Sequence, residues 1–403
     1  MLGKIKQHNM LAFMLAFVAV CTIMGPTAPI INTYVYYAAM ALFAITSMGG
    51  RNRIFNVAYI VLILGAIVSL ITNNVPSAFK AWQRLAFFVL MSIPISPLIE
   101  SRLLRNRRLK AFNYLLWLSV FIGVASFFCY LVGINFMYNY FIGEYSINNA
   151  GWFGGLTVHS MLLGPISALG ASYMTWYSTG TNFSNKINKY IAFACIFLCI
   201  AAAMLTASRG STVAAIVGCV VVYMLRKGKI GYKMNSSIVG LLLIGLLAQP
   251  LLKPFSAMLI AKQKANIESG GTFDSRQGKW QNRIEEFVSN PFWGCGFATV
   301  GAKSGDYSDG GIIEPGTSWL AVLSMLGIIG GICIWIIVFM PMIRIYQRCN
   351  RNDALFFGIF CVFLIHMSTE GYIFAGGNFM FFYFWLFVGS VHAYIKTPNY
   401  KFF

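Results

Sequence analysis

The sequence predicts an all-α polytopic membrane protein, and three observations support this fold class. Hydrophobic residues make up 58% and aromatic residues 16% of the 403-residue chain, and the mean hydropathy of +0.70 is typical of a chain with many membrane helices. Apolar runs of about 20 residues, the length that crosses roughly 30 Å of hydrocarbon as a helix, recur along the whole chain. Basic residues gather in every second connection between these runs.

About twelve transmembrane helices are predicted, and they divide the chain into three parts. Residues 1–253 hold helices one to nine as a scaffold, 254–317 form one large periplasmic loop with short amphipathic helices, and 318–403 hold the last three helices and a cytoplasmic tail. The first span follows only two lysines and shows no small-residue cleavage site, so we expect a retained helix rather than a signal peptide. The predicted spans are 10–24, 29–48, 54–72, 80–99, 112–134, 156–178, 190–207, 212–225, 236–253, 318–341, 354–373 and 377–395.

The positive charge follows the predicted topology. Of the net charge of +19, the connections on one side of the predicted membrane account for +18 and those on the other side for +1. The positive-inside rule therefore places the basic side and both termini in the cytoplasm. Because topology explains the charge, no nucleic-acid partner is expected. Most of the nine cysteines fall inside predicted spans, so no disulfide framework is expected either.

Three charged or titratable residues stand near the outer ends of spans four and six. Lys80 and Arg84 lie one helical turn apart. They either extend to phospholipid phosphates or bind a phosphate of the substrate. His159 follows an aromatic-rich loop at 135–157 and is a structural group or a minor substrate-binding candidate. The aromatic side chains of that loop form either an interfacial belt or a surface for stacking sugars.

A short turn, Thr-Ala-Ser-Arg-Gly-Ser at 206–211, joins spans seven and eight. The turn is too short to leave the membrane surface, so Arg209 is held there between two apolar segments. A guanidinium at that depth is costly unless it meets an anion, which makes Arg209 an anion-binding candidate. Ser208 and Ser211 can donate hydrogen bonds to oxygen atoms of the same ligand. The alternative is a structural ion pair of Arg209 with Glu370 or with the outer loop.

The loop at 254–317 holds seven of the eleven acidic residues and a predicted helix at 275–288. On that helix Arg276, Lys279 and Arg283 recur at helical spacing. Trp280 and Phe287 recur at helical spacing as well. Such a helix is expected to lie flat at the interface, with the tryptophan toward the bilayer and the cations toward phosphate. A tight turn, Pro-Phe-Trp-Gly-Cys-Gly, follows at 291–296.

Two acidic residues stand where the chain meets the last spans. Glu314 lies where the loop re-enters the membrane, and it either complements the helix dipole or points a carboxylate at the substrate. His366 and Glu370 are one turn apart near the outer end of span eleven. Ionisable residues in a membrane helix are costly, so we expect this pair to serve the same outer-facing cavity.

Four motifs, in this order and on these spans, resemble the superfamily of O-antigen ligases and lipid-linked polysaccharide polymerases of bacterial envelopes. They are Ser-Arg-Gly-Ser at 208–211, the outer loop with Ser275-Arg276 and Trp280, Asn-Pro-Phe-Trp-Gly-Cys-Gly at 290–296, and the re-entry Ser-Trp-Leu at 318–320 with Leu-Gly-Ile-Ile-Gly at 326–330. The resemblance covers about 205–331, whereas the first half of the chain is similar only in hydropathy and at 152–164.

The resemblance implies transfer of glycan from an undecaprenyl-pyrophosphate donor to a sugar hydroxyl, with inversion, on the periplasmic side of the bacterial inner membrane. Arg209 and Arg276 match the two arginines that engage the pyrophosphate in this superfamily. Many ligases carry a histidine at the end of the outer loop, where this chain has Glu314-Pro315-Gly316. This departure favours a polymerase over a ligase. Glu314 is the candidate base for the acceptor hydroxyl, with Asp309 as the alternative.

The predicted site therefore has catalytic and substrate-binding residues but no metal and no cofactor, since no carboxylate cluster has convincing Mg²⁺ spacing. The expected partners are the lipid-linked glycan, a glycan acceptor, membrane lipids and a chain-length regulator. A transporter or flippase for the same lipid-linked sugar is the alternative of another class, but the chain shows no duplicated half. The catalytic candidates are Glu314, Arg209 and Arg276, and the substrate-binding candidates are Lys80, Arg84, Ser208, Ser211, Lys279, Arg283, His159 and Glu370.

Overall fold

The residues that the computed structural model describes are mostly helical. They are 2–31, 33–48, 53–139, 144–145, 153–179, 186–226, 277–300, 315–348, 350–397 and 400. Eleven of the twelve predicted spans coincide with helices, and the span at 236–253 lies outside the described residues. Five described helices are long and apolar enough to cross a membrane, and four more are apolar but shorter. The all-helical class is confirmed, while the number of membrane crossings stays a prediction.

Polar side chains cap the beginnings of several helices. Side chains of Asn56, Ser101, Asn350 and Asn378 each accept a hydrogen bond from a backbone N–H in the first turn of the following helix. The helices are α1 (Leu2–Cys21), α2 (Thr33–Ser47), α3 (Val57–Thr72), α4 (Ala81–Ile95), α5 (Arg102–Leu131), α6 (Ser160–Ser178), α7 (Lys186–Leu205), α8 (Arg209–Leu225), α11 (Gln277–Ser289), α12 (Ser318–Ile334), α13 (Met340–Arg348), α14 (Arg351–Thr369) and α15 (Phe379–Lys396).

Short elements complete the described fold. The strands β1 (Ile54–Phe55) and β2 (Ile99–Glu100) pair antiparallel, as do β3 (Tyr138–Asn139) and β4 (Glu144–Tyr145). A 3₁₀ turn, η1, spans Ser77–Phe79, and a π-helical segment, η2, spans Trp335–Phe339 between α12 and α13.

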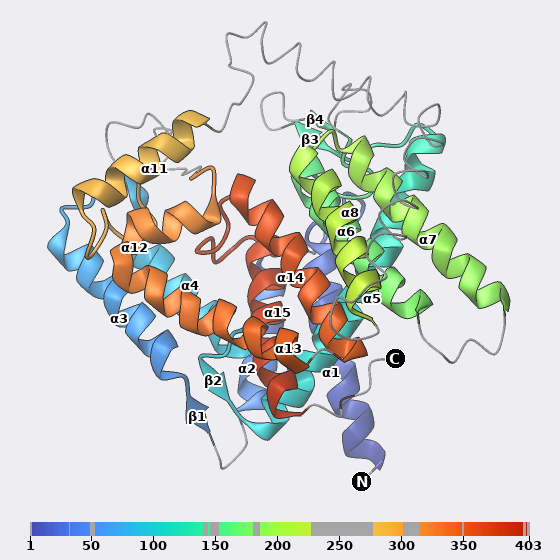
Figure 1. The fold of residues 1–403 in the computed structure, drawn as a ribbon, viewed down its shortest axis with the longest axis horizontal. Coiled ribbons are helices and arrows are strands. Elements are labelled where there is room, and N and C mark those ends of the chain that lie inside the picture. The colour runs from blue at the N-terminus through green and yellow to red at the C-terminus, as the bar shows by residue number, and fades with distance from the viewer. Residues whose placement is uncertain are drawn as a thin grey trace, which may run out of the picture.

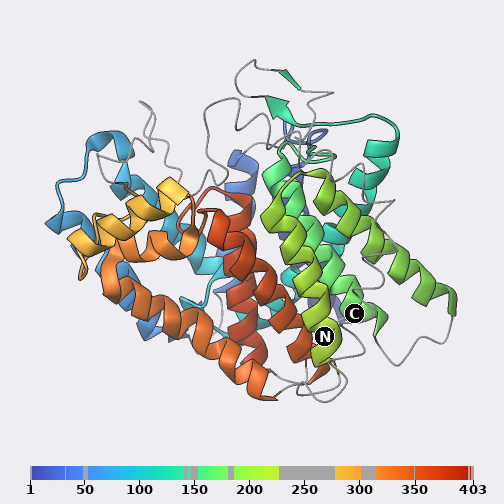
Figure 2. The same cartoon turned by 45° about the horizontal axis from the view of Figure 1, so that its top comes forward.

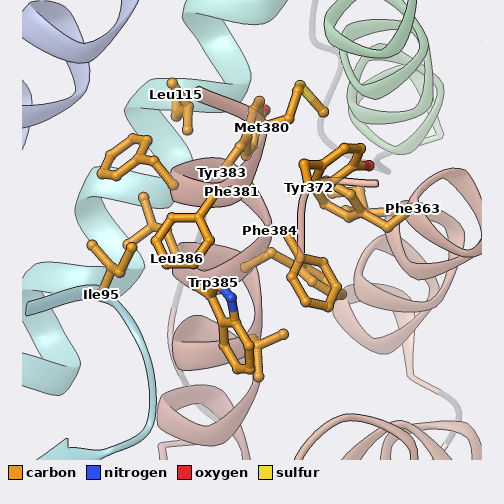
Figure 3. Packing of buried hydrophobic residues seen from close by; sticks show 14 of the residues in the cluster. Ile95, Leu115, Phe363, Tyr372, Met380, Phe381, Tyr383, Phe384, Trp385 and Leu386 are labelled. Carbon is orange, nitrogen blue, oxygen red and sulfur yellow. The ribbon is translucent and has the colours of Figure 1, made fainter. Parts of the chain in front are cut away.

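The helix α15 forms the centre of the bundle (Figure 1). Fifteen of its eighteen residues are buried, because it is aromatic on all sides and needs neighbours all round. Figure 3 shows Phe381, Phe384 and Trp385 packed together with side chains of the surrounding helices. Two polar atoms of this helix have partners: Trp385 Nε1 donates to Ile373 O at 2.9 Å, and the Tyr383 hydroxyl lies 2.9 Å from Ser119 Oγ.

The other helices form two groups around α15. The helices α5, α6, α7 and α8 pack together on one side, and α3, α4, α11 and α12 lie on the other, as Figures 1 and 2 both show. The helix α14 contacts α8 and α6 as well as α12, so it joins the two groups.

The two ends of the bundle differ in the residues they carry. One end, here called the α11 end, holds α11, β3 and β4, and the other, here called the terminal end, holds β1, β2, the beginning of α1 and the end of α15 (Figure 1). Among the described residues, the basic residues predicted to face the cytoplasm fall mostly at the starts of α1, α5, α7 and α14 and at the ends of α8, α13 and α15. Which side of the membrane each end faces stays a prediction.

Candidate functional site

The Arg209 turn is held by its own serines and by α6. Ser208 caps α8, and its Oγ accepts from Ser211 N at 3.3 Å and from Ser211 Oγ at 3.0 Å. Ser211 is buried against Gly164, where an added Cβ would approach Ser211 Oγ to 2.4 Å. The two serines proposed as ligands therefore already fix the turn. Arg209, the first residue of α8, is exposed beside them.

The same turn packs against the end of α14. A Cβ on Gly210 would lie 2.9 Å from Thr369 Oγ1, so the backbone of the turn meets the last turn of α14. Glu370 follows directly as the residue that ends this helix, and it is half-buried. The structure thus brings Arg209 and Glu370, two candidates 161 residues apart in the sequence, to the two sides of one contact.

The start of α12 is tied to the same place. Ser318 Oγ donates to Glu370 O at 2.7 Å and accepts from Tyr372 N at 3.0 Å. Pro315 packs on Gly371, where a Cβ would come within 2.1 Å of the proline ring. The re-entry therefore lies beside the end of α14. Glu314, the residue before Pro315, lies outside the described residues, as does Arg276.

A cavity of about 350 Å³ opens next to these contacts. We call it the glycine-lined cavity, because Gly371, Gly376 and Gly377 form part of its wall. Among the described residues that line it, Arg84 is the one cation, and Pro315 and the polar Asn378 belong to the same lining. The rings of Tyr37 and Phe87, also in the lining, lie 5.5 Å apart. Aromatic faces, backbone groups and one guanidinium are the groups that bind a sugar ring with an anionic substituent.

The structure separates the predicted pair Lys80 and Arg84. Lys80 lies before α4 in the left-handed region with φ of 47°, and it is exposed. Arg84 N donates to Lys80 O at 3.0 Å, which continues the first turn of the helix. Only Arg84 lines the glycine-lined cavity.

The predicted amphipathic helix at 275–288 is α11, observed at Gln277–Ser289. Its Lys279 lies over the re-entry, because a Cβ on Gly316 would approach Lys279 Cβ to 2.8 Å. Gly316 also has φ of +72°, a conformation that favours glycine. The sequence Pro-Gly at 315–316 is thus explained by the close approach of α11. The structure therefore brings Lys279 close to Gly316, at the start of the described re-entry.

Arg283 points the other way from the predicted orientation. Its side chain is fully buried, and its Nη2 lies 2.9 Å from Glu286 Oε1. The prediction that this cation faces headgroup phosphate is therefore corrected: a carboxylate one turn away gives the guanidinium a partner inside the fold. The exposed side of α11 instead carries Ile284 and Val288. Burial and the Glu286 charge raise the pKa of the nearby Cys295 thiol to about 12, so this thiol stays neutral.

His159 and His366, the two histidines considered in the sequence analysis, have structural partners. His159 is the residue before α6, and its Nδ1 accepts from Met161 N at 3.0 Å. His366 is buried, and its Nδ1 lies 3.1 Å from the Tyr372 hydroxyl. The sequence could not reveal this partner, because Tyr372 lies beyond the end of α14 and only the turn of the chain brings it back.

Metal ligation has no support among the described residues, where no three His, Cys, Asp or Glu side chains gather. Asp306, Asp309 and Glu314 lie outside them. The absence of a metal from the reaction therefore stays a prediction. The sequence also missed Thr369 and Asn378, because small and neutral residues carry no chemical signal until packing places them.

A family model described as O-Antigen ligase matches residues 194–335. The match begins within α7, includes the Arg209 turn, α11 and the re-entry, and ends just beyond α12. Arg84, His159 and Glu370 lie outside it. A search of the curated proteins gives no match for this chain.

Proposed function

Since residues 194–335 carry the signature of the O-antigen ligase superfamily, we propose that this membrane glycosyltransferase moves glycan from an undecaprenyl-pyrophosphate donor to a sugar hydroxyl at the α11 end. The match to this superfamily supports a glycosyltransferase of the polymerase or ligase type. The donor, the stereochemistry and the residues that act are our proposal.

The observation that carries this proposal is the meeting of three segments around 369–371. Gly210 of the Arg209 turn contacts Thr369, Pro315 of the re-entry contacts Gly371, and the glycine-lined cavity opens beside them. These segments come from α8, α12 and the connection after α14, so the arrangement is a tertiary feature rather than a local one.

Arg209 is the proposed pyrophosphate ligand. It stands at the first position of α8, where backbone N–H groups and the helix dipole favour an anion. When the glycosyl–pyrophosphate bond breaks, negative charge grows on phosphate oxygens, and a fixed guanidinium stabilises it. Arg276 is proposed as the second ligand. It precedes α11 by one residue, and Lys279 of that helix lies over the re-entry.

The acceptor sugar is proposed to enter the glycine-lined cavity. Tyr37 and Phe87 offer ring faces and Arg84 a cation for an anionic substituent. Glu314, next to the cavity residue Pro315, would take the proton of the acceptor hydroxyl. The hydroxyl oxygen then bonds to the anomeric carbon from the face opposite the leaving group, the bond to pyrophosphate breaks, and undecaprenyl pyrophosphate leaves. Ser208, Ser211, His159 and Glu370 are proposed to support this site without contacting the reacting atoms.

Reconstitution with a lipid-linked oligosaccharide tests the proposal and separates the two activities. A polymerase, which we favour because Glu314 replaces the histidine of many ligases, yields longer chains that are still attached to undecaprenyl pyrophosphate. A ligase yields a product only when a lipid A–core acceptor is added. Movement of the lipid-linked sugar between leaflets without any new glycosidic bond would instead identify a flippase and contradict the proposal.

A further inference from the structure

The helix α12 is broken at Gly327, and the turn at 290–296 fills the break. Gly327 has φ of 62° and ψ of −160°, outside the helical region. In an unbroken helix Ile328 N would donate to Ser324 O. Here Ile328 N donates instead to Pro291 O at 2.8 Å, and Ser324 O accepts from Cys295 N at 2.8 Å.

The break therefore leaves no unpaired group at these positions. Met325 O accepts from Gly296 N at 3.3 Å and from Ser69 Oγ of α3 at 2.8 Å. Backbone groups at membrane depth need partners within the protein, so the break is stable only while the turn occupies it. A Cβ on Gly327 would lie 2.3 Å from Phe292 O, and one on Gly294 2.3 Å from Met325 C, so both glycines are required for this approach. The two motifs at 290–296 and 326–330 are thus two halves of one junction.

Asn73, just after α3, fastens the turn from the other side. Its Nδ2 donates to Gly294 O at 3.0 Å and to Ser69 O at 2.7 Å, and its Oδ1 accepts from Asn290 Nδ2 at 3.1 Å. Asn290 directly follows α11, and Gly294 N donates back to Asn290 O at 2.9 Å. One amide side chain therefore connects α3, the end of α11 and the turn that fills α12.

We infer that Asn73 is a positioning residue for glycan transfer. Its hydrogen bonds set where α11 lies over the re-entry. It touches none of the proposed substrate groups and acts through α11, whose Lys279 covers Gly316. This inference rests on the proposed function. It adds a residue that lies outside the family match at 194–335 and more than 200 positions from α11 in the sequence.

The test measures geometry and activity separately. Spin labels at Gln281 on α11 and at Val213 on α8, both exposed positions, report the distance between the two halves of the site. We expect one narrow distance distribution in the parent protein and a broad or shifted one in Asn73→Ala. Transfer by Asn73→Ala should fall on the order of 10- to 100-fold in kcat, with KM for the donor within about twofold, because the Arg209 turn is untouched.

Asn74→Ala is the matched control, since Asn74 is the adjacent residue of the same type and is exposed. It should change neither readout. Asn73→Asp keeps the side-chain shape and the acceptor for Asn290 but removes both donors, so it should resemble Asn73→Ala. Asn290→Ala removes only the bond to Asn73 Oδ1, and this variant serves if the Asn73 variants fail to fold.

The outcomes are distinct. An unchanged distance distribution in folded Asn73 or Asn290 variants overturns the inference, as does a displaced α11 with undiminished kcat. If the parent protein shows no transfer at all, the proposed function fails. An unchanged distance in the Asn73 variants would then still overturn the positioning of α11.

Discussion

Among single residues, Arg209 carries the strongest expectation. Arg209→Ala removes the fixed cation that stabilises the leaving pyrophosphate, so kcat should fall by on the order of 10²–10³-fold, equivalent to about 2.7–4 kcal/mol in the barrier. The measurement is single-turnover transfer from a lipid-linked donor.

Arg226→Ala is the control for charge and helix. Arg226 ends the same helix and lies 3.6 Å from the centre of the Tyr223 ring. Its loss should leave kcat nearly unchanged. Equal losses in both variants would show that net charge or helix stability, rather than position, explains the effect.

Arg84 and Lys80 form a second comparison at the residue scale. Arg84→Ala should raise KM for the acceptor by about tenfold with a smaller change in kcat, because a cavity cation binds ground state and transition state alike. Lys80→Ala should have little effect, since Lys80 is exposed and does not line the cavity. Steady-state kinetics with varied acceptor distinguish the two. A stronger effect at Lys80 would move the acceptor site away from this cavity.

At the scale of elements, the contact between α11 and the re-entry depends on a missing side chain. Gly316→Ala would place a Cβ 2.8 Å from Lys279 Cβ and would impose φ of +72° on alanine, so we expect about 2 kcal/mol of destabilisation and a lower transfer rate. Thermal unfolding in detergent measures the first quantity.

The helix α11 supplies its own control. A Cβ on Gly278 has no atom within 4 Å, and alanine favours a helix over glycine by roughly 1 kcal/mol. Gly278→Ala should therefore keep or raise the unfolding temperature. A similar loss of stability at both positions would mean that the close approach of Lys279 is not the cause.

For the whole molecule, the two ends should face opposite sides of the membrane. A cysteine at Gly278, on α11, should react with an impermeant thiol reagent from the periplasm, whereas one at Gln347, near the end of α13, should react only after the inner membrane is opened. Cys295 and Cys349 are replaced by serine first. Labelling of both positions from one side would contradict the charge-based topology.

Metal independence is also a property of the whole site. If arginines neutralise the pyrophosphate, transfer should continue at full rate in EDTA. Loss of activity that only added Mg²⁺ restores would show that a cation takes part.

The sequence alone determined the helical class, most helix positions and the presence of a helix at 277–289, and it predicted a site at the turn at 208–211. These features depend on local composition: apolar runs, helical periodicity and short connections are written in consecutive residues. The predicted span at 112–134 missed the first turns of α5, which begins at Arg102, because these turns are rich in charged residues. One of these residues, Arg108, is nevertheless fully buried.

Only the tertiary structure decided which candidates meet. It turned Arg283 inward to Glu286, placed Arg84 but not Lys80 at the cavity, and brought Gly210 against Thr369. It also joined Asn73 to a turn more than 200 residues away. Such contacts depend on how whole helices pack, and glycines, asparagines and serines that permit them give no periodic signal. The sequence therefore shows which elements this protein builds, and packing decides which of their side chains share one site.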